Sequence, residues 1–152
     1  ADVPFCLVGG TKLCRGIGEE ISDFPAPEGV FLVVKPEFGC PTGAAYRKYD
    51  ENPAAVHGGL ERFRMAMPGG YAAEMYNVFQ ALYSDERIED ICRRLKEQGA
   101  NGAMLTGSGS ACFGVFDERA AAERASAQFG GCFTAVCEAA PQGIFISERE
   151  VL

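Results

Sequence analysis

Small residues and hydroxyls gather in one short stretch of the sequence. Gly107-Ser108-Gly109-Ser110-Ala111 follows Thr106 and separates two apolar segments. Glycines allow successive backbone N–H groups to point the same way, and such groups together with hydroxyls bind anions, phosphate among them. A flexible hairpin between two strands has the same composition. The residues alone leave both interpretations open.

The two best-known phosphate loops do not fit this stretch. A Walker A loop needs Gly-Lys-Ser/Thr, and residues 100–117 contain no lysine. A dinucleotide loop needs Gly-x-Gly-x-x-Gly ahead of a helix, whereas Cys112 follows here and begins an apolar segment typical of a strand. An anion site in this stretch would therefore depend on the backbone and the hydroxyls.

Other side chains with chemical potential have ordinary structural interpretations. Asp2 precedes Pro4, a residue typical of the first turn of a helix, so it is expected to cap that helix. Tyr46 and Tyr49 are three residues apart, as in a pair that packs one face of a helix. His57, the one histidine, is expected at the surface. No set of residues has the spacing of a metal site, so we predict none.

Composition describes a folded protein with a limited range of partners. The chain has 152 residues, 47% of them hydrophobic and 23% charged, with a formal net charge of −7. This charge argues against nucleic acid or an anionic membrane as partner, and no segment is long and apolar enough to span a bilayer. The seven cysteines lack a Cys-x-x-Cys pair and lie mostly in apolar segments, which predicts buried, reduced thiols in a cytoplasmic protein.

The periodicity of apolar residues predicts the elements that must position these side chains. We expect strands over 11–15, 30–34, 102–106, 111–116, 132–138 and 143–147. We expect helices over 3–8, from an N-cap at Thr42 through Tyr49, over 71–83, from a cap at Ser84 to Gly99, and from a cap at Asp117 to Phe129. Residues 50–70 give no clear pattern. The order predicts an α+β fold, a ferredoxin-like split βαβ sandwich.

Several motifs resemble one family. Residues 105–114, Leu-Thr-Gly-Ser-Gly-Ser-Ala-Cys-Phe-Gly, resemble the C-terminal signature of the GHMP kinases, which phosphorylate small metabolites. The segments 1–5 (Ala-Asp-Val-Pro-Phe), 16–19 (Gly-Ile-Gly-Glu) and 41–46 (Pro-Thr-Gly-Ala-Ala-Tyr) are similar to the branch that acts on a cytidine diphosphate derivative of methylerythritol, in non-mevalonate isoprenoid biosynthesis. The resemblance extends from residue 1 to about 140.

The resemblance implies an ATP- and Mg²⁺-dependent transfer of a phosphoryl group to an alcohol. It implies that Asp2 is the catalytic carboxylate, since an ionised group beside a helix N-terminus suits a proton acceptor. Tyr46 would stack on the cytosine ring, with Pro41 and Thr42 in the same pocket. Gly107, Ser108 and Gly109 would lie near the phosphates or the reacting hydroxyl.

One departure from the family pattern is large. No segment resembles the domain that holds the family's ATP loop and catalytic lysine. The resemblance thus implies that residues 1–152 are the C-terminal domain, with 1–20 a residual segment of the missing N-terminal domain, and that this chain alone is inactive. We expect self-association through apolar residues such as Phe5 and Leu7, which that domain would otherwise cover. In a smaller departure, residues 77–80 (Asn-Val-Phe-Gln) replace an acidic Asn-Asp-x-Glu, to which no role is assigned.

Two alternative functions remain open. A ferredoxin-like fold also suits a stand-alone module that binds a nucleotide or small effector without catalysis. A different GHMP kinase, acting on homoserine or mevalonate, shares the residues of the 105–114 signature. The segment 41–46 weighs against that second alternative.

Overall fold

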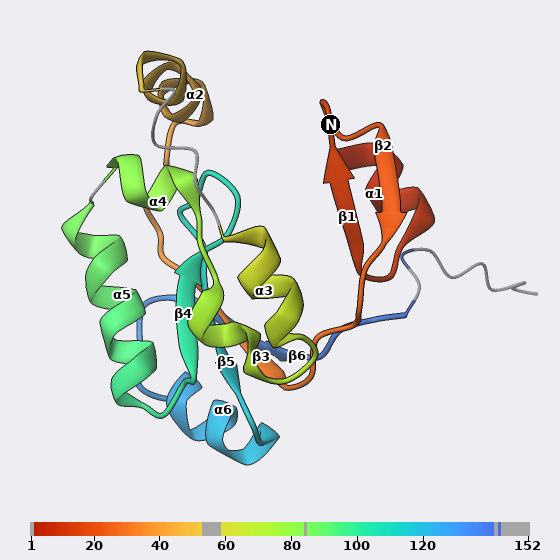
Figure 1. The fold of residues 1–152 in the computed structure, drawn as a ribbon. Coiled ribbons are helices and arrows are strands. Elements are labelled where there is room, and N and C mark those ends of the chain that lie inside the picture. Colours follow the sequence, from red (N-terminus) through yellow and green to blue (C-terminus); the bar gives the residue numbers. More distant parts are fainter. Residues whose placement is uncertain (1, 53–58, 84, 142, 144–152) are drawn as a thin grey trace, which may run out of the picture. The chain divides into compact units, whose positions relative to one another are not determined.

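The structure is a computed structural model that describes residues 2–52, 59–83, 85–141 and 143. Contacts divide the chain into two units (Figure 1). The smaller unit comprises residues 1–27 with 139–152, and the larger comprises residues 28–138. Each unit has its own arrangement of elements.

The smaller unit contains one helix and a two-stranded hairpin. Helix α1 spans Asp2–Val8, and strands β1 (Lys12–Arg15) and β2 (Glu20–Asp23) pair antiparallel. The predicted helix and first strand are confirmed, whereas β2 was missed because its polar, mostly exposed residues lack a hydrophobic pattern. Gly16 has a φ of +63°, which lets the chain turn between the strands.

A four-stranded antiparallel sheet forms the centre of the larger unit. Its strands are β3 (Val30–Lys35), β4 (Gly102–Leu105), β5 (Cys112–Phe116) and β6 (Phe133–Cys137). Their spatial order is β4-β5-β3-β6. Helices separate β3 from β4 and β5 from β6, so the connectivity is that of a split βαβ unit and the predicted ferredoxin-like fold is confirmed.

Helices α5 (Glu86–Glu97) and α6 (Arg119–Ser126) cover one face of this sheet (Figure 1). Val30, Leu32 and Val34 point to that face and are buried with the apolar residues of both helices. The alternate residue Phe31 points to the opposite face, where it contacts Phe113. Helix α3 (Leu60–Ala66) and the 3₁₀ helix η2 (Gly70–Glu74) contribute Phe63 and Tyr71 to that second cluster. Because alternate side chains of β3 pack into two different apolar clusters, the sequence of this strand is almost continuously apolar.

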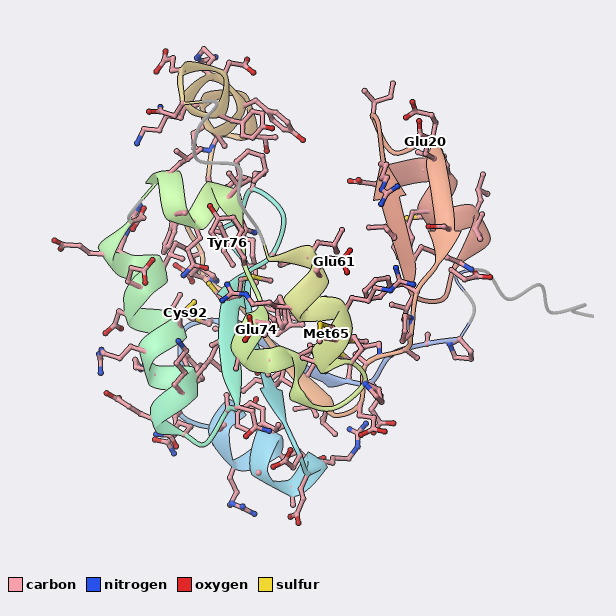
Figure 2. All side chains as sticks on the ribbon, in the orientation of Figure 1. Glu20, Glu61, Met65, Glu74, Tyr76 and Cys92 are labelled. Atoms are coloured by element: carbon pink, nitrogen blue, oxygen red, sulfur yellow. The ribbon has the colours of Figure 1, made fainter. Side chains whose placement is uncertain are left out.

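Helix α5 agrees with its predicted pattern. Its buried residues, Ile88, Ile91, Cys92 and Leu95, recur with the 3.6-residue period of a helix. Figure 2 labels Cys92 on this helix, where its side chain belongs to the core between helix and sheet. The cap is Asp85, whose carboxylate accepts a hydrogen bond from the backbone N–H of Arg87. The expected cap, Ser84, lies outside the described residues.

Three other boundaries differ from prediction. Helix α2 spans Thr42–Glu51 with Pro41 at the N-cap position, so Thr42 is inside the helix and its hydroxyl is available for other contacts. The cap position of α6 is Glu118, and the Asp117 carboxylate accepts a hydrogen bond from the Asn101 side chain. Helix α6 ends at Ser126, although Phe129 is still buried beyond it. Of the last predicted strand, residues 144–147 lie outside the described residues.

The segment predicted as a single helix over 71–83 is divided into two. The 3₁₀ helix ends at Glu74, and helix α4 begins at Val78 and ends at Tyr83. The Asn77 side chain accepts hydrogen bonds from the N–H groups of Phe79 and Gln80, which caps α4 and begins a new helix there. Apolar spacing alone gave no signal of this break.

The cysteines and the helices bear on two further expectations. All seven cysteines are free thiols, as expected. The expectation that they are buried is right for Cys92 and Cys112 and wrong for the other five, which are half-buried or exposed. None of the described helices combines the length and apolar character needed to cross a lipid bilayer. His57 lies outside the described residues.

A close backbone contact on β4 provides a test of the packing. A Cβ added to Gly102 would lie 2.2 Å from the carbonyl oxygen of Ala72, whereas one added to Gly130 would meet no atom within 4 Å. We therefore expect Gly102→Ala to lower the free energy of unfolding by about 1–3 kcal/mol in urea titration. Gly130→Ala is the matched control, expected within about 0.5 kcal/mol of the wild type. Equal effects of the two substitutions would contradict the packing of η2 on β4.

Candidate functional site

Residues 106–111, which we call the glycine loop, join strands β4 and β5. The loop is held by its own backbone: the Thr106 N–H donates to the Ala111 carbonyl at 2.9 Å, and the Gly109 N–H donates to the Thr106 carbonyl at 3.0 Å. Gly107 and Gly109 have φ angles of +55° and +89°, which favour glycine. The loop is thus a defined turn, and the Gly109 N–H is already used within it. An anion would meet the N–H groups of Gly107 and Ser108.

Gly109 also has a steric reason to lack a side chain. A Cβ at this position would lie 2.8 Å from the Leu105 side chain and 3.1 Å from the sulfur of Cys40. The lack of a side chain here is therefore explained partly by the protein's own atoms, which lie close to Gly109.

Ser110 has a structural role instead of the ligand-binding role that its hydroxyl suggested. It is 1% exposed, and its hydroxyl donates to the carbonyl oxygen of Phe38. The same carbonyl accepts a hydrogen bond from the Lys35 ammonium at 3.2 Å. These contacts fix the loop to the segment that follows β3. Of the other two hydroxyl residues of the loop, Thr106 is exposed and Ser108 is half-exposed.

A direct hydrogen bond joins two segments that the sequence analysis singled out separately. The hydroxyls of Thr42, at the start of α2, and Ser108, in the glycine loop, lie 2.9 Å apart although 66 residues separate them in sequence. The preceding Pro41 is exposed at the cap position of α2. The predicted residues Pro41, Thr42, Gly107, Ser108 and Gly109 therefore form one continuous surface.

Tyr46 lies one helical turn after Thr42 and is 53% exposed. Its ring makes an edge-to-face contact with Phe79 of α4, with ring centres 5.1 Å apart and an angle of 67° between the planes. Both sequence interpretations thus have a basis, because the ring is packed on one side and open to solvent on another. An aromatic ring supported in this way can stack on a planar ligand.

Two side chains that the sequence analysis left without a role fix the base of the glycine loop. The Asn77 amide nitrogen donates to the carbonyls of Leu105 and Gly107, both at 2.9 Å. The Gln80 amide oxygen accepts from the Leu105 N–H at 2.8 Å. Figure 1 shows α4 at the same end of the sheet as the loop, and Figure 2 labels Glu74 and Tyr76 on the segment that leads to Asn77.

An ion pair supports the same region from α5. Arg87 donates two hydrogen bonds to the Asp85 carboxylate, at 3.0 and 2.8 Å, and its guanidinium lies 3.9 Å from the centre of the Phe38 ring. The Arg87 side chain lowers the pKa of Asp85 to about 2, against an ordinary value of 3.8. Asp85 is therefore ionised at neutral pH and holds Arg87 over Phe38, whose carbonyl accepts the hydrogen bond from the Ser110 hydroxyl.

A small pocket with room for about one water molecule opens behind the loop. Its lining residues are Cys40, Phe79, Gln80, Asp85, Ile88, Leu105 and Ser108. Burial raises the pKa of the Cys40 thiol, and the Asp85 carboxylate raises it further. Cys40 is accordingly a neutral thiol at neutral pH and is not suited to act as a nucleophile.

Asp2 belongs to the smaller unit, where it is the exposed first residue of α1. Its carboxylate is thus accessible, as a group that meets a substrate must be. Across residues 2–52, 59–83, 85–141 and 143, no three His, Cys, Asp or Glu side chains gather as potential metal ligands.

Comparison with known proteins identifies the family. The sequence pattern of the family described as "GHMP kinases C terminal" matches residues 55–140. The chain belongs to the GHMP kinases. The match includes the glycine loop together with Asn77 and Gln80, whereas Pro41, Thr42 and Tyr46 precede the matched residues.

Individual relatives extend the comparison. A curated relative from Clostridium novyi (strain NT), named 4-diphosphocytidyl-2-C-methyl-D-erythritol kinase, is 38% identical over 131 residues, which cover 82% of this chain and 47% of the relative. The chain spans about half the length of the curated relatives it matches.

Solved structures show the same fold. A crystal structure of 4-(cytidine 5'-diphospho)-2C-methyl-D-erythritol kinase superimposes with a TM-score of 0.74 at 24% identity, over 92% of this chain and 54% of the other. Homoserine kinase from Cytophaga hutchinsonii superimposes with a TM-score of 0.67 at 19% identity, over 93% and 52%. At these identities the structural likeness establishes the fold.

The ion pair at the start of α5 makes stability depend on pH in a defined direction. The pKa of the Asp85 carboxylate is lowered in the folded state, so its stabilising effect is full above about pH 4 and is lost as the pH falls toward 2. Asp85→Asn keeps a helix-capping side chain but removes the charge. We expect it to cost about 1 kcal/mol of unfolding free energy near neutral pH and much less near about pH 2.5.

Urea unfolding of both proteins across this pH range measures the difference. A cost that stays constant from neutral to acidic pH would show that Arg87 does not hold an ionised Asp85 at this site.

Proposed function

We propose that the protein containing this chain transfers the γ-phosphoryl group of ATP to a hydroxyl of 4-diphosphocytidyl-2-C-methyl-D-erythritol, in non-mevalonate isoprenoid biosynthesis. The proposal rests on family membership and on relatives of that name that are 34–38% identical to the chain. Because the chain spans about half the length of those relatives, the activity is proposed for the full-length protein and not for these residues alone.

The observation that carries the proposal is the hydrogen bond between Thr42 and Ser108. It brings the exposed ring of Tyr46 and the glycine loop onto one surface. A nucleotide needs an aromatic surface for its base and N–H groups and hydroxyls for its phosphates. These two kinds of group occur here on neighbouring segments of one unit.

In this arrangement Tyr46 stacks on the cytosine ring, and Pro41 and Thr42 line the pocket beside it. Stacking of a base on one aromatic side chain is worth about 1–3 kcal/mol. Gly107, Ser108 and Gly109 lie along the diphosphate or the hydroxyl that is phosphorylated, where side chains larger than serine would obstruct approach. The Gly107 and Ser108 N–H groups point the loop's partial positive charge toward the anion.

Asp2 is the proposed catalytic carboxylate. Phosphoryl transfer requires a group that accepts or orients the proton of the attacking hydroxyl. Asp2 is exposed in the first turn of α1. It would accept the hydroxyl proton as the oxygen–phosphorus bond forms, and the released nucleotide would leave with the electrons of the broken bond.

The proposal includes groups that this chain does not supply. In such reactions ATP supplies the phosphoryl group and Mg²⁺ neutralises its charge, and no residue of this chain is assigned to either. We propose that residues 1–20 belong with an ATP-binding domain, which covers the exposed apolar side chains of α1, Val3, Leu7 and Val8. The free thiols favour the cytoplasm as the compartment.

The role of Asp2 gives the test of the proposed activity. In the full-length protein, Asp2→Asn is expected to lower kcat by about 10²–10⁴-fold while KM stays within a few-fold, because the substrate binds but its proton has no acceptor. Steady-state phosphorylation assays with ATP and the cytidine substrate measure both constants.

Glu20→Gln is the matched control, since Glu20 is another exposed carboxylate of the same unit (Figure 2). It is expected to leave turnover unchanged. Turnover of Asp2→Asn within a few-fold of the wild type would remove Asp2 from the mechanism. Phosphorylation of homoserine or mevalonate in preference to the cytidine substrate would redirect the proposal to another branch of the family.

A further inference from the structure

Asn77 has every polar position of its side chain occupied, and all its partners belong to two segments. Its amide nitrogen donates to the carbonyls of Leu105 and Gly107, and its amide oxygen accepts from the N–H groups of Phe79 and Gln80 at 2.8 and 3.2 Å. The orientation is fixed by chemistry, because two acceptors lie on one side of the amide and two donors on the other. One side chain thus joins the start of α4 to the glycine loop.

Gln80, one turn further along α4, provides a second connection. Its amide oxygen accepts from the Leu105 N–H, and its nitrogen donates to the Glu89 carboxylate of α5 at 3.2 Å. Leu105 is the last residue of β4, where the loop begins. Its N–H is bound by Gln80 and its carbonyl by Asn77, so two amide side chains fix both polar groups of this residue.

We propose that Asn77 is a positioning residue that sets the conformation of the glycine loop, with Gln80 as its support. This inference rests on the proposed function, in which the loop meets phosphate or the reacting hydroxyl. Asn77 touches no substrate itself. It holds the Leu105 and Gly107 carbonyls inward, toward α4, and so leaves the Gly107 and Ser108 N–H groups, which make no hydrogen bond within the loop, free to face a ligand.

The four hydrogen bonds of Asn77 require an amide side chain, because a side chain that only accepts hydrogen bonds could cap α4 but could not bind the two carbonyls. Aspartate caps a helix as well as asparagine does. A carboxylate, however, offers no donor and would set negative charge against two carbonyl oxygens. Asn77→Asp therefore keeps the α4 cap and removes the attachment of the loop, which separates the two roles of this side chain.

Asn101→Asp is the matched control at the opposite end of β4. The Asn101 side chain donates to the Asp117 carboxylate, so the substitution likewise replaces a donating amide by a carboxylate facing an acceptor. Asn101 is exposed and makes no contact with the glycine loop among the described residues. The effect of this substitution measures the general consequence of replacing a donating amide with a carboxylate.

The first measurement is amide hydrogen exchange of the chain by NMR, which needs no activity. The Thr106 and Gly109 N–H groups are hydrogen-bonded within the loop, and the Asn101 N–H is bonded to Val115 at the far end of the strand. Asn77→Asp is expected to speed exchange at Thr106 and Gly109 at least tenfold while the Asn101 amide keeps its rate. If the exchange rates of the Thr106 and Gly109 amides change no more in Asn77→Asp than in Asn101→Asp, the proposal is overturned.

The second measurement is kinetic and uses the full-length kinase. Asn77→Asp is expected to lower kcat by about 100-fold, as expected for a displacement of about 1 Å at a site. Asn101→Asp is expected to leave kcat within a few-fold. A normal kcat in Asn77→Asp overturns the proposal, whatever the exchange data show.

The two measurements also separate this inference from the proposed function. A wild-type protein with no kinase activity would defeat the proposed function, and the exchange rates would still decide whether Asn77 holds the loop. An active wild type with an unaffected Asn77→Asp variant would defeat this inference alone.

Discussion

The hydrogen-bonded attachment of residues 105–107 to α4 and of residue 108 to α2 is the constraint from which the rest of the candidate site follows. Strands β4 and β5 are antiparallel neighbours, with Leu105 opposite Cys112, and the connection between them contains no side chain larger than threonine. Such a turn buries little apolar surface of its own, so its conformation depends on polar contacts. Asn77, Gln80 and Thr42 supply those contacts from one side, and the Phe38 carbonyl anchors Ser110 from another. In the proposed function, a ligand would therefore meet a prearranged turn and would not have to order a flexible one.

Much of the fold could be predicted because its signals are local. The apolar stripe of α5 and the continuous apolar run of β3 identify both elements, and the order of elements leads to the ferredoxin-like connectivity. Strand β2 gave no such signal, since Ile21 is its one apolar residue and the other three positions are polar and exposed. The break before α4 was missed because apolar residues on both sides of Asn77 continue a helical spacing, although asparagine is a residue type that caps helices and Asn77 caps α4.

The candidate site shows the same division between local and distant information. The glycine loop and the start of α2 were recognised as separate motifs, and the resemblance to GHMP kinases connected them before any contact between them was known. Their hydrogen bond spans 66 residues, a distance at which no pattern of spacing operates. Asn77 and Gln80 were quoted but given no role, because amide side chains inside an apolar segment carry no distinctive sequence signal. Ser110 was the opposite case: its hydroxyl, one of those that an anion site in this stretch could have used, anchors the loop instead.

The central claim is that the glycine loop and the start of α2 form one ligand-binding surface, and an NMR titration of the chain with cytidine 5'-diphosphate tests it most directly. The account predicts chemical-shift changes at Thr42, Tyr46, Gly107 and Ser108 that follow a single binding curve, and weaker binding by Tyr46→Ala. Its basis is that these residues occupy adjoining segments of one unit. Shift changes confined to other elements, or separate curves for the loop and for α2, would contradict the claim.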